Sequence, residues 1–184
     1  MKLIVALTAA VALGLGVVGL SCPHVCLGSE ADPWEVGVRS GFTFFNPGKN
    51  FEQVDLFLRH RLPVAWSLGE GCQLGMRAEG AAGILLGNGG RNGMVASVGP
   101  DLVLGLFHDR LRLHAGTRLA LISRYDYGYR NFGGPLQFIN HLGVSLRVTD
   151  SLVVGYRFQH MSNADIYTNN PGLNISLLEF GLLF

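Results

Sequence analysis

The spacing of the apolar residues constrains the fold most, because they recur at every second position through much of the chain. In the first such stretch the apolar positions are Trp34, Val36, Val38, Phe42 and Phe44, with mostly polar residues or glycine between them. Residues 53–61, 111–121 and 138–148 repeat the pattern. Successive side chains of a β-strand point to opposite faces, so this period predicts strands with one apolar face.

We predict eight strands from this alternation, at residues 34–45, 51–61, 68–86, 94–106, 111–124, 136–148, 152–161 and 173–184. Most of them have about 9–13 residues, which is enough to cross a bilayer when a strand is tilted. Two all-β architectures fit the pattern. In a soluble sandwich the apolar faces form a core, whereas in an eight-stranded antiparallel transmembrane β-barrel they contact lipid.

The N-terminal residues indicate export. Lys2 is the sole charge ahead of an apolar run from Leu3 to Leu20. This pattern predicts a secretory signal peptide over residues 1–28, cleaved between residues 21 and 31, which leaves residues 29–184 as the exported domain. An uncleaved membrane helix and lipidation of Cys22 are the alternatives for this segment.

Composition and the C-terminus favour the barrel over the sandwich. Charged residues make up 15% of the chain and hydrophobic residues 48%, whereas soluble domains usually carry about 25% charge. The chain ends in Phe184, preceded by apolar residues at alternate positions, which resembles the C-terminal signature strand of bacterial outer-membrane barrels. The net charge of +1, without a basic cluster, argues against a nucleic-acid partner.

A barrel of this size is filled by side chains, so we expect a polar network inside it and no pore. Its expected members are Arg39, Asp55, Arg59, Arg77, Glu79, Arg118, Arg147, Arg157 and Glu179. An even number of strands places both termini in the periplasm, with short periplasmic turns and longer external loops. We expect turns at 62–67, 108–110 and 149–151, and long external loops at 125–135 and 162–172.

Two polar residues interrupt the lipid-facing positions at the end of the seventh predicted strand. His160 and Ser162 continue the face of Phe158, and alternate residues on a strand lie about 6.6 Å apart. An imidazole at this spacing can reach the hydroxyl, as nucleophilic catalysis requires. Counting back from Phe184 places Asn174 on the same face of the last strand, where it can orient His160. Simple interfacial polarity is the alternative interpretation.

The segment from 156 to 174 resembles the lipid A 3-O-deacylase family. The matching residues are Tyr156-Arg-Phe-Gln-His160-Met-Ser162-Asn163-Ala164 and Asn170-Pro171-Gly172-Leu173-Asn174. The resemblance implies an eight-stranded outer-membrane barrel that hydrolyses the acyl ester at position 3 of lipid A, with Ser162 as nucleophile and His160 as base. It assigns Asn163 and Asn170 to the oxyanion region or to shaping of the loop.

Two residues depart from the family pattern. Asn174 stands where known members carry the glutamate of the triad. An asparagine can fix the tautomer of a histidine but cannot stabilise imidazolium by charge. Asp165 stands where a glycine commonly follows the Ser-Asn-Ala sequence, and it is an alternative source of the missing carboxylate.

We therefore expect a serine esterase of the bacterial outer membrane that acts on lipid A and uses neither metal nor cofactor. The expected partners are lipid A and the membrane itself, and a homodimer is left open. The alternative is a non-enzymatic barrel that binds lipopolysaccharide or has a structural role. Asn174 is the residue that discriminates between the two, because loss of the triad acid is expected in a relative that no longer catalyses the reaction.

Overall fold

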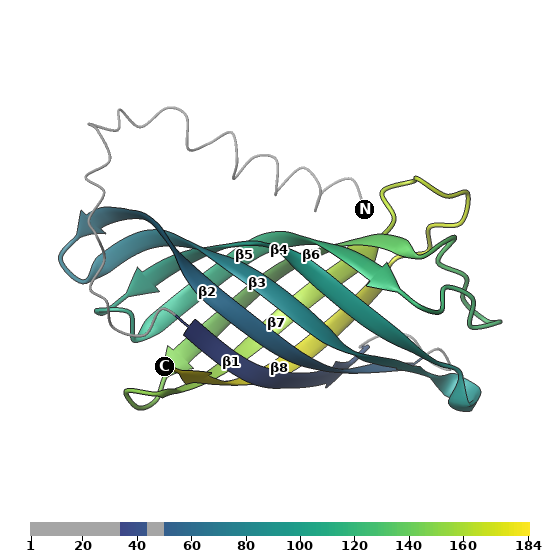
Figure 1. Ribbon diagram of the computed structural model, residues 1–184, viewed down its shortest axis with the longest axis horizontal. Helices are drawn as coiled ribbons and strands as arrows, with labels where there is room; N and C mark the ends of the chain where they lie inside the picture. The colour runs from purple at the N-terminus through teal and green to yellow at the C-terminus, as the bar shows by residue number, and fades with distance from the viewer. Residues whose placement is uncertain (1–33, 44–49) are drawn as a thin grey trace.

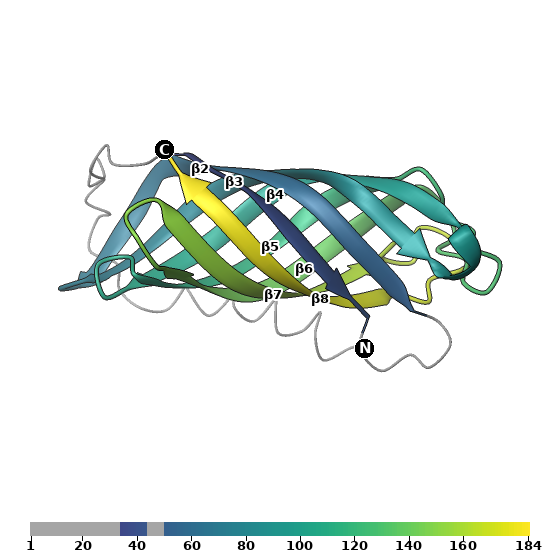
Figure 2. The ribbon, with the colours of Figure 1, turned by 90° about the horizontal axis from the view of Figure 1, so that it is seen from below.

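Eight antiparallel strands close into one barrel in the computed structural model, which describes residues 34–43 and 50–184 (Figure 1). The strands are β1 (Trp34–Phe42), β2 (Phe51–Gly69), β3 (Cys72–Gly87), β4 (Asn92–Leu106), β5 (Leu111–Ile122), β6 (Leu136–Arg147), β7 (Leu152–Ser162) and β8 (Leu173–Leu183). Each strand pairs with its sequence neighbours, and β1 pairs with β8 to close the barrel (Figure 2). The predicted fold class is confirmed.

The expected signal peptide over residues 1–28, and its cleavage point, lie outside the described residues. Within 34–43 and 50–184, no helix is long and apolar enough to cross a membrane.

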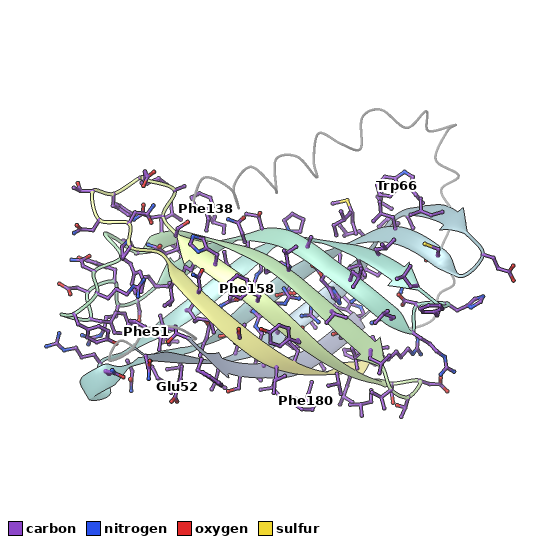
Figure 3. All side chains as sticks on the ribbon, turned by 180° about the vertical axis from the view of Figure 1, so that it is seen from behind. Phe51, Glu52, Trp66, Phe138, Phe158 and Phe180 are labelled. Carbon is purple, nitrogen blue, oxygen red and sulfur yellow. The ribbon has the colours of Figure 1, made fainter. Side chains whose placement is uncertain are left out.

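The two faces of the barrel wall have opposite polarity. Large apolar side chains such as Leu56, Leu142 and Phe180 are exposed on the outside, whereas Arg39 and Glu79 are buried inside. Figure 3 shows Phe180 projecting away from the wall. A soluble sandwich buries its apolar faces, so this arrangement excludes it and is that of a membrane barrel.

A charged network fills the middle of the barrel. The carboxylate of Glu79 forms ion pairs with Arg39 at 2.8 Å, Arg59 at 2.7 Å, Arg118 at 2.8 Å and Arg157 at 3.0 Å. Buried charges in a low-dielectric interior require such pairing. The network that was predicted from residue parity is therefore confirmed at these positions.

The prediction was wrong for Arg147 and incomplete elsewhere. Arg147 lies at the end of β6, where its guanidinium donates to the backbone carbonyls of Thr149 and Asp150 in the following turn. Alternation along a strand fixes which side of the wall a side chain faces, but not how far along the barrel axis it lies. It therefore does not distinguish Arg147 at a strand end from the charged residues in the middle of the barrel. Glu35 and Arg112 also join the interior, and Glu35 accepts a hydrogen bond of 2.6 Å from Arg59.

The other end of the interior is apolar. Phe51 packs against Tyr127 and Phe132, with ring centroids 4.9 Å and 5.7 Å apart, and both partners belong to the loop between β5 and β6. The cluster continues over buried residues of the strands, including Ile139 and Met161. The loop therefore folds into the barrel mouth and packs against the wall from inside. We call this end the loop end and the opposite end the turn end.

The hairpin between β2 and β3 differs most from the prediction. The expected turn at 62–67 lies within β2, which continues to Gly69, and the hairpin of β2 and β3 extends beyond the other strands at the turn end (Figure 1). Pro63 lies in this stretch and has no N–H to donate to the ladder. The structure accommodates it in a register shift between Arg61 and Ala65, since a bulge leaves a residue unpaired. The turns at 108–110 and 149–151 are confirmed.

We expect Glu79→Gln to lower the free energy of unfolding by about 3 kcal/mol or more, because it removes one partner from several buried ion pairs. Urea titration of the protein folded in lipid vesicles, followed by the gel shift of the folded barrel, measures this. Glu52→Gln is the control, since Glu52 is exposed at the loop end. Equal midpoints for the two variants would show that the network contributes little to stability.

Candidate functional site

The candidate site lies on the outer, lipid-facing surface of the barrel, where β7 and β8 reach the loop end. His160 and Asn174 are direct cross-strand partners. The Nδ1 atom of His160 lies 2.7 Å from the Oδ1 atom of Asn174. An amide oxygen is only an acceptor, so this contact places the proton of the neutral imidazole on Nδ1. Nε2 then keeps the lone pair that a general base needs.

Ser162 follows His160 by two positions and is the last residue of β7. Both side chains are half-buried on the outer surface. The imidazole lies next to Gly172, because a Cβ built on Gly172 would lie 2.9 Å from Cε1 and 3.5 Å from Nε2. Gly172 directly precedes Leu173, the partner of Met161. Gly172 and Ser162 thus both lie on the loop-end side of His160.

The two predicted asparagines of the loop bind its backbone. The Nδ2 atom of Asn163 donates to the carbonyls of Phe132 at 2.8 Å and Asn169 at 2.7 Å. The backbone N–H of Asn163 donates to Oδ1 of Asn170 at 3.1 Å. The sequence suggested either the oxyanion region or loop shaping for these two asparagines, and the contacts described here correspond to loop shaping. They fix the backbone directly after Ser162.

Asp165 does not replace the missing carboxylate in this geometry. Its Oδ1 accepts a hydrogen bond of 2.8 Å from Nδ2 of Asn170, within the same loop. Its backbone has a φ of 64°, a left-handed conformation that glycine adopts without strain and that aspartate tolerates better than most residues. Asp165 therefore keeps the conformation that a glycine would take here.

A contact that the sequence analysis missed holds the site from the neighbouring loop. The guanidinium of Arg130, between β5 and β6, donates to the carbonyl oxygens of Pro171 and Gly172. Gly172 is also the residue that lies next to the imidazole of His160. No periodic pattern marks Arg130, because its partners come from a loop about 40 residues further along the chain. Within the described residues, no group of three or more His, Cys, Asp or Glu side chains is suited to hold a metal ion.

The fold and the site define a small membrane barrel with a histidine and a serine on its lipid-facing wall. A family model described as lipid A 3-O-deacylase (PagL) matches residues 52–182. The chain therefore belongs to the lipid A 3-O-deacylase family, and its activity is deacylation of lipid A. Since lipid A is a component of the outer membrane, this is the membrane in which the barrel lies.

A relative and a solved structure are also similar to this chain. The lipid A deacylase PagL of Bordetella bronchiseptica is 27% identical over 176 residues, which cover 92% of this chain and 94% of that protein. A crystal structure of the outer membrane enzyme PagL superposes with a TM-score of 0.70 at 22% identity, covering 82% of this chain and 99% of that one.

We expect Gly172→Ala to reduce deacylation at least tenfold while the barrel still folds. The added Cβ would meet Cε1 of His160 at 2.9 Å and displace the ring. Mass spectrometry of lipid A after incubation with the refolded variant measures the loss. Gly89→Ala is a matched control, because Gly89 also has a positive φ of 76° but nothing lies within 4 Å of the added atom. Equal activity of both variants would remove Gly172 from the site.

Proposed function

We propose that this barrel hydrolyses the 3-O-linked acyl ester of lipid A with Ser162 as nucleophile, His160 as general base and Asn174 as the residue that positions His160. The observation that carries the proposal is the 2.7 Å contact between His160 and Asn174 on the lipid-facing wall. It leaves Nε2 as the basic nitrogen of the imidazole, and Ser162 follows two positions further along the same face of β7. The proposed reaction class is that of a carboxylic ester hydrolase.

The reaction follows the two-step course of a nucleophilic hydrolase. Oγ of Ser162 attacks the ester carbonyl carbon while its proton passes to Nε2 of His160. Collapse of the tetrahedral intermediate breaks the bond to the sugar oxygen, which takes the proton from the imidazolium. Water then attacks the acyl-serine while His160 takes its proton. The bond to Oγ of Ser162 breaks, Oγ recovers the proton from the imidazolium, and the free fatty acid leaves. Asn163 and Asn170 contribute by holding the backbone after Ser162 in place.

The position of the site suits a substrate that arrives from within the membrane. The loop end of a bacterial outer-membrane barrel is external and the short turns are periplasmic. His160 and Ser162 then lie at the level of the outer leaflet, where the acyl esters of lipid A are found. A site on the outer wall admits such a substrate by lateral diffusion, without passage through the filled interior.

The sequence also left open a barrel that binds lipopolysaccharide without cleaving it. The family match over residues 52–182 favours the enzyme. Asn174 bears on the rate of that enzyme, because an amide has no charge to stabilise the imidazolium that forms during the reaction. The variants below measure this effect.

We expect Ser162→Ala and His160→Ala each to lower the deacylation rate by about 10³-fold or more, because the members of a catalytic unit act together. The measurement is the acyl count of lipid A by mass spectrometry, with refolded protein at matched folded fraction. Ser176→Ala is the control, since Ser176 is a second serine on the outer wall, where it accepts a hydrogen bond of 2.9 Å from Tyr156. Full activity of either site variant would contradict the mechanism, and an inactive wild-type barrel would favour the binding protein.

We expect Asn174→Asp or Asn174→Glu to raise the rate, because a carboxylate stabilises the imidazolium that forms when Ser162 loses its proton. Asn174→Leu should lower the rate, because it removes the acceptor that fixes the His160 tautomer. Initial rates at matched folded fraction report the effect. If all three variants have the wild-type rate and differ only in stability, Asn174 serves the loop and not the imidazole.

A further inference from the structure

The interior of the barrel holds more buried guanidinium groups than buried carboxylates. Among the described residues, the buried arginines are Arg39, Arg59, Arg77, Arg112, Arg118 and Arg157, and the buried carboxylates are Glu35, Asp55, Glu79, Asp101 and Glu179. A guanidinium keeps its proton in proteins, and burial of an ion without an opposite charge is costly. Protonation of either buried histidine, His114 or His141, would only enlarge the excess. One positive charge of the interior is therefore left to be balanced.

A small cavity at the turn end of the interior brings several of these charges together. Its charged lining consists of four arginines and one carboxylate, namely Arg59, Arg61, Arg77, Arg112 and Glu35. Leu183, the cross-strand partner of Glu35 in the seam between β1 and β8, also lines it (Figure 1). The centre of a water-sized particle has about 10 Å³ available there. This space suits one particle of that size.

The arginines of the cavity share a single carboxylate. Oε1 of Glu35 pairs with Arg59 at 2.6 Å, and Oε2 pairs with Arg77 at 3.0 Å and with Arg112 at 3.5 Å. Arg59 has further partners in the middle of the barrel, since it also contacts Glu79 and Glu179 at 2.7 Å each. Within residues 34–43 and 50–184, Arg77 has Glu35 as its one ion-pair partner. The unbalanced charge therefore lies at Arg77 and Arg112.

A second pair near the cavity does not remove the excess. Arg61 and Asp109 are partly exposed and pair with each other at 2.8 Å, so their charges cancel. Asp109 also contacts Arg112 at 2.6 Å. Arg61 is the direct cross-strand partner of Arg77, and like charges that face each other across a strand pair repel. The count of one excess cation at this end of the interior stays the same.

One buried donor of the cavity lining lacks an acceptor. Arg112 is 1% exposed, and its two terminal nitrogens donate to Glu35 and Asp109. Nε of Arg112 has no hydrogen-bond partner in the part of the chain that the structure describes. A buried donor without an acceptor keeps the full penalty of its desolvation. An acceptor with a negative charge would satisfy the donor and balance the excess cation together.

We propose that this cavity binds one small monovalent anion of the halide class, such as chloride, between Arg77 and Arg112. Its single negative charge equals the excess of the interior, and its size is close to that of the space. A water molecule has the right size but brings no charge, and a phosphate is too large. The turn end of such a barrel is periplasmic, so the ion comes from that side. This site is separate from His160 and goes beyond the proposed function.

Bromide is a suitable probe, because its anomalous X-ray scattering distinguishes it from water. Crystals of the full refolded barrel are grown in sodium bromide. We expect an anomalous peak in the cavity, in contact with Arg77 and with Nε of Arg112. A peak at exposed arginines such as Arg110 without one in the cavity would overturn the proposal, and so would an ordered water molecule in the cavity.

The stability of the barrel shows whether the ion belongs to the fold. Urea titrations in lipid vesicles compare sodium bromide with sodium gluconate at equal ionic strength, since gluconate is too large for the cavity. We expect a higher midpoint in bromide. At a bromide concentration 100 times the dissociation constant, the folding equilibrium constant rises about 100-fold. Equal midpoints in the two salts would make any bromide in the cavity an adventitious ion only and would overturn the proposal.

Arg77→Met removes the excess cation, while Glu35 keeps Arg59 and Arg112 as partners. We expect this variant to lose the anomalous peak and the difference between the salts, and to be at least as stable as the wild type in gluconate. Arg110→Gln is the matched control, exposed at the same end, and should keep the bromide effect. An undiminished bromide effect in Arg77→Met would contradict the proposal. If Arg77→Met does not fold, the two wild-type measurements decide.

Discussion

The pairing of β1 with β8 is the contact on which the rest of the structure depends. Hydrocarbon offers no partner for an exposed strand edge, so a sheet in a membrane has to close on itself. The register of this seam places Arg39 opposite Glu179, and their side chains also form an ion pair at 3.4 Å inside the barrel. A shift by one residue would turn every charge outward. Closure and internal charge pairing therefore stabilise the same register.

The filled interior makes the wall a rigid support for a site on its outer surface. Ion pairs around Glu79 fix the middle of the barrel, and the cluster of Phe51, Tyr127 and Phe132 fills the loop end. The loop between β5 and β6 contributes to this cluster and also supplies Arg130, which holds the carbonyl oxygens of Pro171 and Gly172. Packing inside the mouth is thereby linked to the geometry around His160 outside it.

A site on the outer wall uses the strand pairing itself for positioning. His160 and Asn174 are adjacent because their strands are hydrogen-bonded neighbours in register. The same geometry places Asn140 on the other side of His160. The outer wall needs no pocket of the usual kind, since the bilayer already holds the acyl chain against it. What distinguishes the site from the surrounding wall is the row of polar side chains across an otherwise apolar surface.

The sequence alone determined the strands, their two faces and the placement of His160, Ser162 and Asn174 on one face, because side-chain direction in a strand alternates with period two and needs only local information. Only the tertiary structure decided that β2 passes Pro63 through a bulge, that Arg130 donates to the loop before β8, and that Asn140 adjoins His160. These features depend on register and on contacts between segments far apart in the chain. Parity gives the face of a residue, whereas its neighbours on that face are set when the strands pair.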